Sequence, residues 1–309
     1  MGGDLKLKNN NYKKYSLTWE NSTANVERYT FSPSIYIEFT ELSATDYSIG
    51  TYKGANQFRI DYTKIGRYEC EFLDHTYSYR GENEITILTT TESGEWVVSA
   101  SIPTKAYNGC VLIIEYDKLT DRDKELFIRF GIDINSLTEA FNSKLKWCKI
   151  ADDDKYTDIF AEMYDANKKQ NAELIFVKAL ELLVLSASDN KAAHIYPAKA
   201  CYLPSKQVEL TKEIHAFILK KYGTFISFEK LASDYGITYS LFNDSFKIIY
   251  GDTPYQYLKK LRMNIAAEKL KSTNLSTTEI ANSVGYTNAS KFASAFKSIH
   301  GKLPHEFKK

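Results

Sequence analysis

The sequence lacks the features by which several classes of protein are recognised. It has only four cysteines in 309 residues, widely spaced and without a CxxC pair, which argues against a structural zinc site or a disulfide framework. No two histidines are separated by a single residue, and residues 1–190 contain only His75. A glycine-rich phosphate loop and a GxSxG motif are also missing. We therefore predict no metal, no cofactor and no enzymatic activity.

Long hydrophobic runs are also absent. The longest apolar stretch, Ala179–Leu185, is interrupted by Glu181 and is far shorter than the ~20 residues that a membrane span requires. The first 14 residues are polar and lack the apolar core of a signal peptide. These absences predict a soluble, cytoplasmic protein with no membrane partner.

The composition is that of a globular protein, because 43% of the residues are apolar and 26% are charged. This excludes a disordered, collagenous or coiled-coil chain, and the length predicts two domains. The net charge of +1 hides an asymmetry. Residues 206–309 carry 15 lysines and one arginine against nine acidic residues, a net charge of +7, which leaves −6 on residues 1–205. Such asymmetry is typical of nucleic-acid or anionic-surface binding.

The N-terminal two-thirds of the chain first shows strand patterns and then helical ones. Apolar and polar residues alternate at 58–62, 85–89 and 96–102, and 111–116 is a short apolar run of the kind found in buried strands. Helical periodicity begins at Asp121 and predicts helices that include 156–167 and 173–186. We therefore expect strands at about 30–116 and helices at about 120–187.

The segment Glu173–Ser186 is apolar around most of its circumference, so it is expected to be buried on most sides. The sequence leaves two explanations open. The helix either lies in the core of its own domain or also packs against a second subunit in a homodimer. The residues predicted to form that dimer contact are Leu174, Val177, Leu180 and Val184.

Two prolines mark the predicted domain junction. Pro197 and Pro204 interrupt the periodic pattern, so residues 191–206 are predicted to link a domain at 1–190 to an all-helical domain at 207–309. The fold class predicted for the whole chain is therefore α+β.

The C-terminal region contains one motif twice. The segments LASDYGIT (231–238) and IANSVGYT (280–287) align with a separation of 49 residues. The pattern FxxxFK follows at 242–247 and 292–297, and GxxP at 251–254 and 301–304, now 50 residues apart. One residue inserted in the turn explains the change in separation.

Each copy has the pattern of a helix-turn-helix. A small alanine permits close helix packing, and the glycine four residues later allows the positive φ that ends the first helix. Thr238 and Thr287 are placed to cap the second helix, whose phenylalanines would face the core and leave the opposite face free. A helix predicted at 255–273 would span roughly 25 Å. It could therefore place the two second helices about one DNA turn, ~34 Å, apart.

These residues resemble the AraC/XylS family of bacterial transcription regulators. Segment 280–297 with GKLP at 301–304 is similar to the family signature, and Lys260–Leu270 is similar to its connecting helix. Residues 200–205 resemble a subgroup that includes regulators of siderophore uptake. The resemblance covers about a third of the chain. It implies two helix-turn-helix units joined by a linker helix, double-stranded DNA and RNA polymerase as partners, and a cupin-like N-terminal β-barrel with helices that binds an effector or dimerises.

In the family, bases are contacted from the exposed face near the start of each second helix. The corresponding residues here are Ser240, Leu241, Asn243, Asp244, Ala289, Ser290, Lys291 and Ser294. Asn243 can pair with adenine and Lys291 with guanine. Asp244 stands where many relatives carry arginine, and its carboxylate can only accept hydrogen bonds, for example from cytosine N4.

A second group of residues is predicted to contact phosphates without reading sequence. Its members are Thr238, Lys247, Lys260, Arg262, Thr278, Thr287 and Lys297. The alternative for any one residue of either group is that it belongs to a solvated polar face.

Aromatic and charged residues of the strand region are candidates for a ligand pocket, and cross-strand pairing is the alternative explanation. They are Arg59, Tyr62, Arg67, Tyr68 and Trp96. The predicted function is a sequence-specific DNA-binding regulator, an activator, controlled by a small ligand or a partner through the N-terminal domain. The alternatives are a ligand-independent regulator controlled by a partner protein and an architectural DNA-binding protein.

Overall fold

The chain divides into two compact units, residues 1–202 and 203–309, called here the N-terminal and C-terminal units. The division falls inside the segment predicted as a linker. The computed structural model describes residues 11–19, 22–43, 56–90, 97–141, 148–150, 154–189, 195–197 and 202–307.

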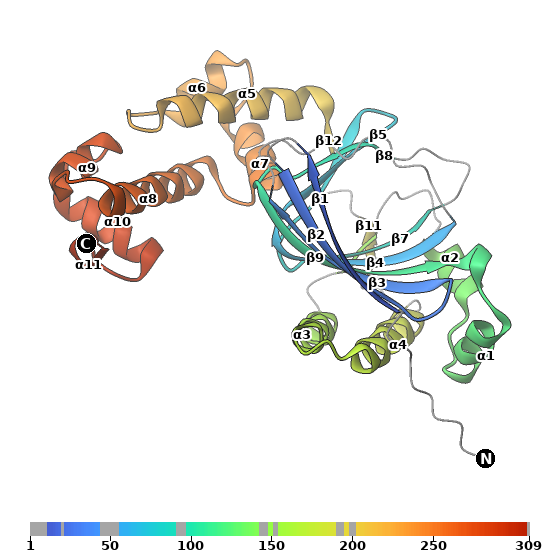
Figure 1. Cartoon of the computed structure of the whole chain (residues 1–309). Helices are drawn as coiled ribbons and strands as arrows, with labels where there is room; N and C mark the ends of the chain where they lie inside the picture. Colours follow the sequence, from blue (N-terminus) through green and yellow to red (C-terminus); the bar gives the residue numbers. More distant parts are fainter. Residues whose placement is uncertain are drawn as a thin grey trace. The chain divides into compact units, whose positions relative to one another are not determined.

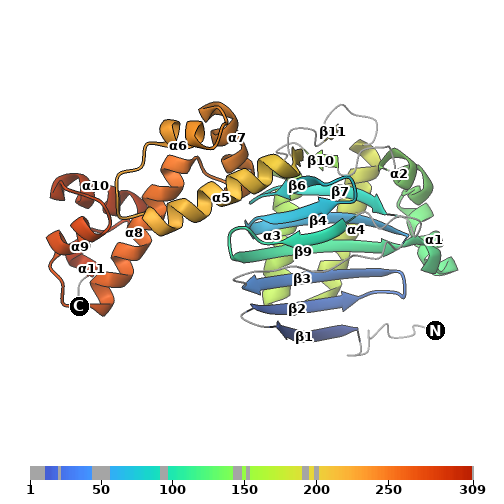
Figure 2. The same cartoon turned by 90° about the horizontal axis from the view of Figure 1, so that it is seen from above.

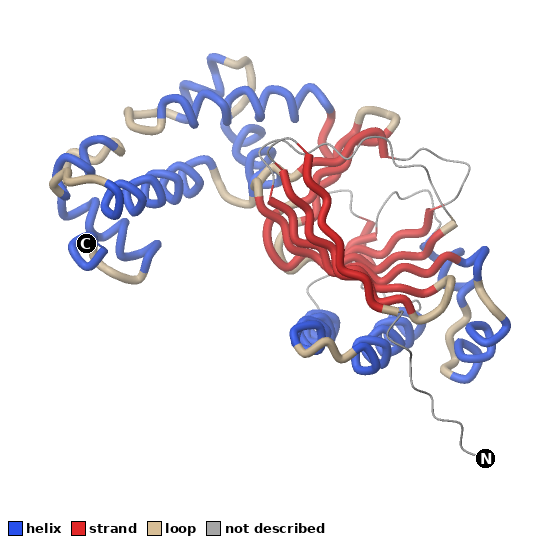
Figure 3. Tube along the Cα trace, viewed as in Figure 1, coloured by secondary structure: helices blue, strands red, loops and turns tan. Residues whose placement is uncertain are grey.

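Antiparallel strands form two sheets in the N-terminal unit (Figures 1 and 3). The larger has the order β1-β2-β3-β9-β4-β7-β10-β11, and the smaller β12-β6-β5-β8. The strands are β1 Tyr12–Trp19, β2 Ser22–Thr30, β3 Ile35–Ser43, β4 Gln57–Gly66, β5 Tyr68–Phe72, β6 Thr76–Arg80, β7 Ile85–Thr90, β8 Val97–Ser101, β9 Ala106–Glu115, β10 Cys148–Ile150, β11 Ile195–Pro197 and β12 Tyr202–Pro204.

The sheet begins earlier in the chain than predicted, because β1 and β2 precede residue 30. In β1, side chains 13–18 are exposed, so this edge strand lacks the buried apolar face that alternation detects. It forms by backbone pairing with β2, and the Tyr12 and Tyr29 rings meet 4.9 Å apart at one end.

The segment predicted as a linker also contains strands. Both β11 and β12 form there, and helix α5 already begins at Ser205. Each strand is at the edge of its sheet and ends on a proline, Pro197 or Pro204. Proline is tolerated at sheet edges, where a missing N–H breaks no ladder. The prolines therefore end strands rather than mark irregular chain.

The helices of the N-terminal unit share a core with the larger sheet, and the last two of them lie along one of its faces (Figure 1). They are a 3-10 turn at Tyr116–Lys118, α1 Asp121–Arg129, α2 Ile134–Phe141, α3 Asp154–Lys168 and α4 Ala172–Asp189. Phe160 of α3 stacks on Tyr62 of β4 at 4.7 Å, and Tyr164 meets Phe39 of β3 edge-on at 5.1 Å. The predicted helices at 156–167 and 173–186 correspond to α3 and α4, and α3 lies fully on this core.

The four residues predicted to form a dimer contact lie on two different sides of helix α4. Leu180 is buried and Val184 is half-buried against the core, whereas Leu174 and Val177 are 38% and 55% exposed. The apolar circumference therefore has a core side and an exposed side.

From Ser205 on, the C-terminal unit is all helical (Figure 2). Its helices are α5 Ser205–Lys221, α6 Phe228–Asp234, α7 Tyr239–Tyr250, α8 Pro254–Ser272, α9 Thr277–Ser283, α10 Ala289–His300 and α11 Pro304–Phe307. Helix α8 lies between the pair α6–α7 and the pair α9–α10. The α+β class is therefore confirmed, while a closed cupin-like barrel remains a prediction.

Candidate nucleic-acid interface

Two copies of one helix-turn-helix arrangement are built from α6 with α7 and from α9 with α10, called here the first and second units of the motif. Ser227 caps α6 and Ser276 caps α9, 49 residues apart, each accepting a hydrogen bond from a backbone N–H of the first turn. The glycines that end these helices, Gly236 and Gly285, have φ values of +71° and +82°. The role predicted for both glycines is therefore confirmed.

The second helices begin on caps that differ from the prediction in one copy. Thr238 caps α7 by accepting a hydrogen bond from the Leu241 N–H, as expected. In the second copy the cap is Asn288, whose Oδ1 accepts from the Lys291 N–H at 2.9 Å, and not Thr287. Since Thr238 and Asn288 are 50 residues apart, the inserted residue lies before the cap, and Thr287 is an exposed residue of the longer turn.

The apolar stripes of both second helices face the core as predicted. Phe242 and Phe246 of α7 are fully buried, and so are Phe292 and Phe296 of α10. Their ring centroids lie 5.5 Å and 5.8 Å apart, respectively. Because the stripe fixes the rotation of each helix, the opposite face is presented to solvent.

That opposite face holds the residues predicted to contact bases. On α7, Ser240, Leu241 and Asp244 are exposed and Asn243 is half-buried. All four candidates of α10 are exposed, namely Ala289, Ser290, Lys291 and Ser294. The two faces differ in chemistry, because α7 offers an apolar side chain and a carboxylate where α10 offers a lysine and serines.

The candidates for phosphate contact divide into free and engaged side chains. Lys247 and Lys297 occupy equivalent exposed positions on α7 and α10. Lys260 instead forms an ion pair with Asp252, with Nζ–O distances of 2.7 and 2.9 Å. Of the threonines, Thr278 is exposed in the first turn of α9.

Arg262 is engaged within the C-terminal unit. Its Nε donates to the Tyr222 carbonyl and its Nη2 to the Thr224 carbonyl, both at 2.7 Å. No pattern in the sequence indicates this internal role, because a basic residue on a predicted DNA-binding helix is first assigned to phosphate.

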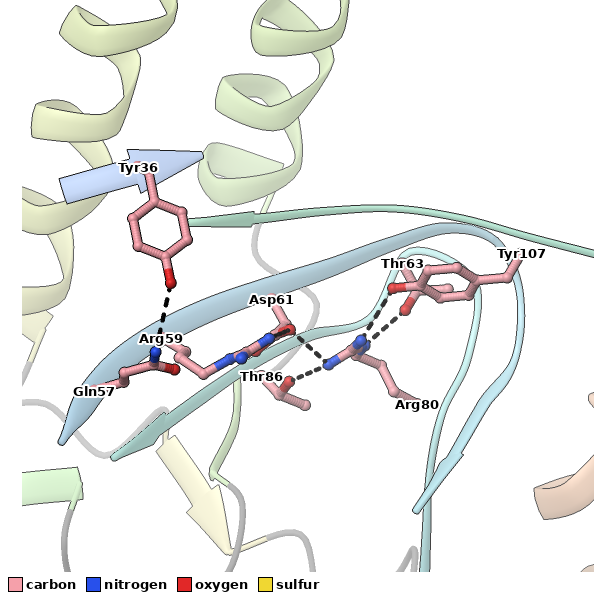
Figure 4. Close-up of polar contacts among 8 residues, drawn as sticks. All are labelled: Tyr36, Gln57, Arg59, Asp61, Thr63, Arg80, Thr86 and Tyr107. Atoms are coloured by element: carbon pink, nitrogen blue, oxygen red, sulfur yellow. Dashed lines mark hydrogen bonds and ion pairs between the residues drawn. The ribbon is translucent and has the colours of Figure 1, made fainter. Parts of the chain in front are cut away.

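A polar cluster lies between the two sheets of the N-terminal unit (Figure 4). Arg80 of the smaller sheet donates to three hydroxyls of the larger sheet, those of Thr63, Thr86 and Tyr107. Its Nη1 also lies 3.3 Å from Asp61 Oδ1, and Arg59 Nη2 lies 3.2 Å from the same oxygen. Burial by itself raises the pKa of Asp61, but the two guanidinium groups outweigh it and hold that pKa below its usual range.

The residues predicted to line a ligand pocket do not all meet there. Arg59 and Tyr68 belong to the cluster, with Arg80 Cζ 5.2 Å above the Tyr68 ring. Tyr62 is on the opposite face of β4, against α3, because it lies three positions after Arg59 and side chains alternate along a strand. Arg67 donates its backbone N–H to Thr104, and Trp96 lies outside the described residues.

Arg80 was not predicted, and only the register of β6 reveals it. In the sequence TYSYR, Ser78 and Arg80 share a face, and pairing with β5 turns that face inward. Among the described residues, the Ser78 hydroxyl is buried without a hydrogen-bond partner. Nearby, burial raises the pKa of the Cys70 thiol to about 12, so this cysteine is an inert core residue.

Within the ranges given above, no group of three or more His, Cys, Asp or Glu side chains is arranged to hold a metal ion. No helix in that part of the chain is both long and apolar enough to cross a membrane.

Comparison with known proteins agrees with the C-terminal geometry. Residues 231–309 match the helix-turn-helix domain family. The raffinose operon transcriptional regulatory protein RafR of Pediococcus pentosaceus is 30% identical over 37% of this chain and 41% of its own length. RclR of Escherichia coli, an RCS-specific transcriptional activator, is 38% identical over 26% of this chain and 28% of its own length.

Among solved structures, the C-terminal domain of AraT, a response regulator from Geobacillus stearothermophilus, is 29% identical with a TM-score of 0.31, covering 32% of this chain and 83% of that domain. The chain spans less than half the length of the curated relatives it matches. The C-terminal unit contains an AraC-type helix-turn-helix domain.

Proposed function

We propose that the protein is a sequence-specific DNA-binding regulator of transcription in the cytoplasm. The observation that carries this proposal is the pair of helices α7 and α10, which bury equivalent phenylalanines and present polar faces to solvent. A helix with one free polar face fits the major groove, and the charge of +7 on residues 206–309 attracts phosphate. The two helices would enter successive grooves of one duplex.

Selection from randomised DNA duplexes with the full chain tests DNA binding. Enrichment of one sequence is expected, and no enrichment would contradict the proposal. Ser290→Glu places a carboxylate on the exposed face of α10 and should abolish binding. Its matched control is Ala216→Glu, which adds the same charge to an exposed position of α5 and should retain most of the affinity. A footprint spread over unrelated sequences would instead favour an architectural protein.

We further propose that a small polar ligand binds in the N-terminal unit beside the polar cluster. The supporting observation is Ser78, since a buried hydroxyl without a partner costs roughly 1–3 kcal/mol that a ligand could recover. The Arg59 side chain lies on the face of the larger sheet that carries the polar cluster. It is 20% exposed, so its guanidinium can supply a positive charge to the ligand.

The melting temperature of the full chain, measured against a panel of metabolites, tests for this ligand. Ser78→Ala should leave the ligand-free melting temperature unchanged or raise it, while abolishing the shift caused by a ligand. Ser101→Ala is the control, because its hydroxyl donates to Glu69 and its loss should lower stability without removing the shift. Absence of any shift across the panel would favour control by a partner protein.

We also propose activation of RNA polymerase and homodimerisation. Activation is suggested by RclR, whose name describes an activator. Dimerisation is suggested by Leu174 and Val177, two apolar side chains exposed one turn apart on α4. Between α3 and α4 there is also a pocket of about 370 Å³, with Ile159, Val184 and Leu185 among the residues that line it.

A further inference from the structure

Helix α5 packs against α7 of the first unit, with the His215 and Tyr250 rings stacked at 4.0 Å, and the end of α5 meets the second unit at a junction on α8. This junction consists of Tyr222 and Gly223 at the end of α5, Arg262 in the middle of α8, and Ser283 and Gly285 at the end of α9. The Tyr222 side chain packs against the core formed by α8, α9 and α10. The first unit is therefore attached to the second through α5 as well as through the continuous helix α8.

Arg262 is the polar centre of this junction. The carbonyl of Tyr222, at the C-cap of α5, has no partner within its own helix, and the guanidinium satisfies both it and the Thr224 carbonyl. A cation at a helix C-terminus also interacts favourably with the helix dipole. Arg262 thus attaches the end of α5 to α8 through two charge-assisted hydrogen bonds.

The other side of the guanidinium faces the turn of the second unit. A Cβ atom built on Gly285 would lie 2.9 Å from Arg262 Nη2 and 3.0 Å from the Gly223 carbonyl oxygen, so a side chain has no room there. The Tyr286 ring lies 5.8 Å from Arg262 Cζ. One side chain therefore contacts the end of α5 and the turn before α10.

The backbone at the end of α5 is also in close contact with the second unit. A Cβ atom on Gly223 would lie 2.9 Å from the Ser283 carbonyl oxygen. The side chain of Ser283 is held in turn by Lys269, whose Nζ donates to its Oγ at 2.8 Å. Such a tight contact permits little sliding of α5 past α9.

We propose that Arg262 is a positioning residue that fixes the angle and separation of α7 and α10, and so sets the spacing between the two DNA subsites. This inference rests on the proposed function. Inserting one base pair between the two DNA subsites rotates the second subsite about the helix axis by roughly a tenth of a turn relative to the first. A rigid pair of units would tolerate one spacing, whereas a loosened pair would tolerate several.

The test measures the affinity of the full chain for selected duplexes in which base pairs are inserted or deleted between the two subsites, at one salt concentration. We expect the wild type to prefer one spacing by about tenfold or more over its neighbours, on the scale of one or two such hydrogen bonds. Arg262→Gln and Arg262→Lys should flatten this profile. Lys260→Gln removes a charge from the same helix outside the junction and should weaken binding equally at all spacings.

Gly223→Ala gives an independent variant that keeps every charge. Its new Cβ must push Ser283 away, so it should also flatten or shift the profile. The inference would be overturned if affinity depended on subsite spacing in the same way in the wild type and in all three variants, Arg262→Gln, Arg262→Lys and Gly223→Ala.

A measurement without DNA separates this inference from the proposed function. Spin labels on Ser240→Cys and Ser290→Cys, with Cys148 and Cys201 replaced by serine, report the distance between α7 and α10. A narrow distribution that broadens in Arg262→Lys supports the positioning role even if the chain binds no DNA. An unchanged distribution overturns it.

Discussion

Arg80 and Asp61 form an ion pair between the two sheets of the N-terminal unit, with 3.3 Å between Nη1 and Oδ1. Both side chains are almost completely buried, at 4% and 7% exposure. Removing Asp61 would take from the buried Arg80 guanidinium the carboxylate that balances its charge. Breaking this ion pair between the sheets should therefore strongly destabilise the N-terminal unit.

Asp61→Asn should lower the free energy of unfolding by about 3–5 kcal/mol, the usual cost of breaking a buried ion pair. Urea unfolding of the full chain, followed by circular dichroism, measures this change. Asp165→Asn is the matched control, because Asp165 pairs with Lys168 on the surface and its replacement should have no measurable effect. Equal effects of the two substitutions would contradict the assignment.

The same ion pair predicts a dependence on pH. Asp61 has a depressed pKa in the folded state, so its stabilisation is complete above the unfolded value of about 3.9 and is lost as pH falls through the folded value. The difference in unfolding free energy between wild type and Asp61→Asn should therefore shrink below about pH 4. A difference that stays constant from pH 7 to pH 2.5 would argue against ionised Asp61.

Lys291→Ala should change the sequence that the protein prefers. Lys291 is exposed near the start of α10, where a loss of base contact costs roughly 1–3 kcal/mol at one position of the site. Lys297→Ala, two turns along the same helix, should weaken all sequences alike and reduce the salt slope by about one. Titrations of selected and shuffled duplexes at two salt concentrations distinguish these outcomes, and equal losses for both variants on both duplexes would refute the distinction.

Asn288→Ala should destabilise the first turn of α10, whereas Thr287→Ala should not. Asn288 supplies the cap of that helix, and losing a cap costs about 1 kcal/mol. Hydrogen exchange of the Lys291 amide should therefore accelerate by roughly fivefold in the first variant only. Acceleration by Thr287→Ala would instead place the cap one residue earlier.

Val177→Glu should yield a folded monomer if the exposed side of α4 forms the homodimer contact. Leu180→Glu should unfold the N-terminal unit, because Leu180 is only 8% exposed. Analytical ultracentrifugation and circular dichroism report the two properties separately. A dimer that persists in Val177→Glu would exclude this contact.

The repeated motif and the helical periodicity of the sequence predicted the C-terminal unit well. The buried positions of Phe242 and Phe292, the positive φ of Gly236 and Gly285, and the helix between the repeats all follow from local rules that the sequence displays. The cap of α10 was misplaced because an insertion of one residue can be positioned on either side of a cap when only spacings are known.

The N-terminal unit was less predictable because its strands depend on distant partners. The exposed strand β1 has no apolar pattern, and the edge strands β11 and β12 contain prolines. The meeting of Arg80 with Asp61 requires the register of three strands from two sheets. No spacing in the sequence encodes that register.

The short helix α11 shows where the structural repeat of the C-terminal unit ends. Pro304 and Phe307 lie 50 residues after Pro254 and Tyr257, and Phe307 contacts Phe296 at 5.1 Å much as Tyr257 contacts Phe246 at 5.4 Å. The first turn of α8 therefore closes one copy while its later turns begin the next, and α11 closes the second copy in the same way. The structural repeat therefore includes this closing turn, and its two copies share helix α8. The single extra residue of the second copy, Thr287, lies in a solvent-exposed turn, where it leaves the paired aromatic cores undisturbed.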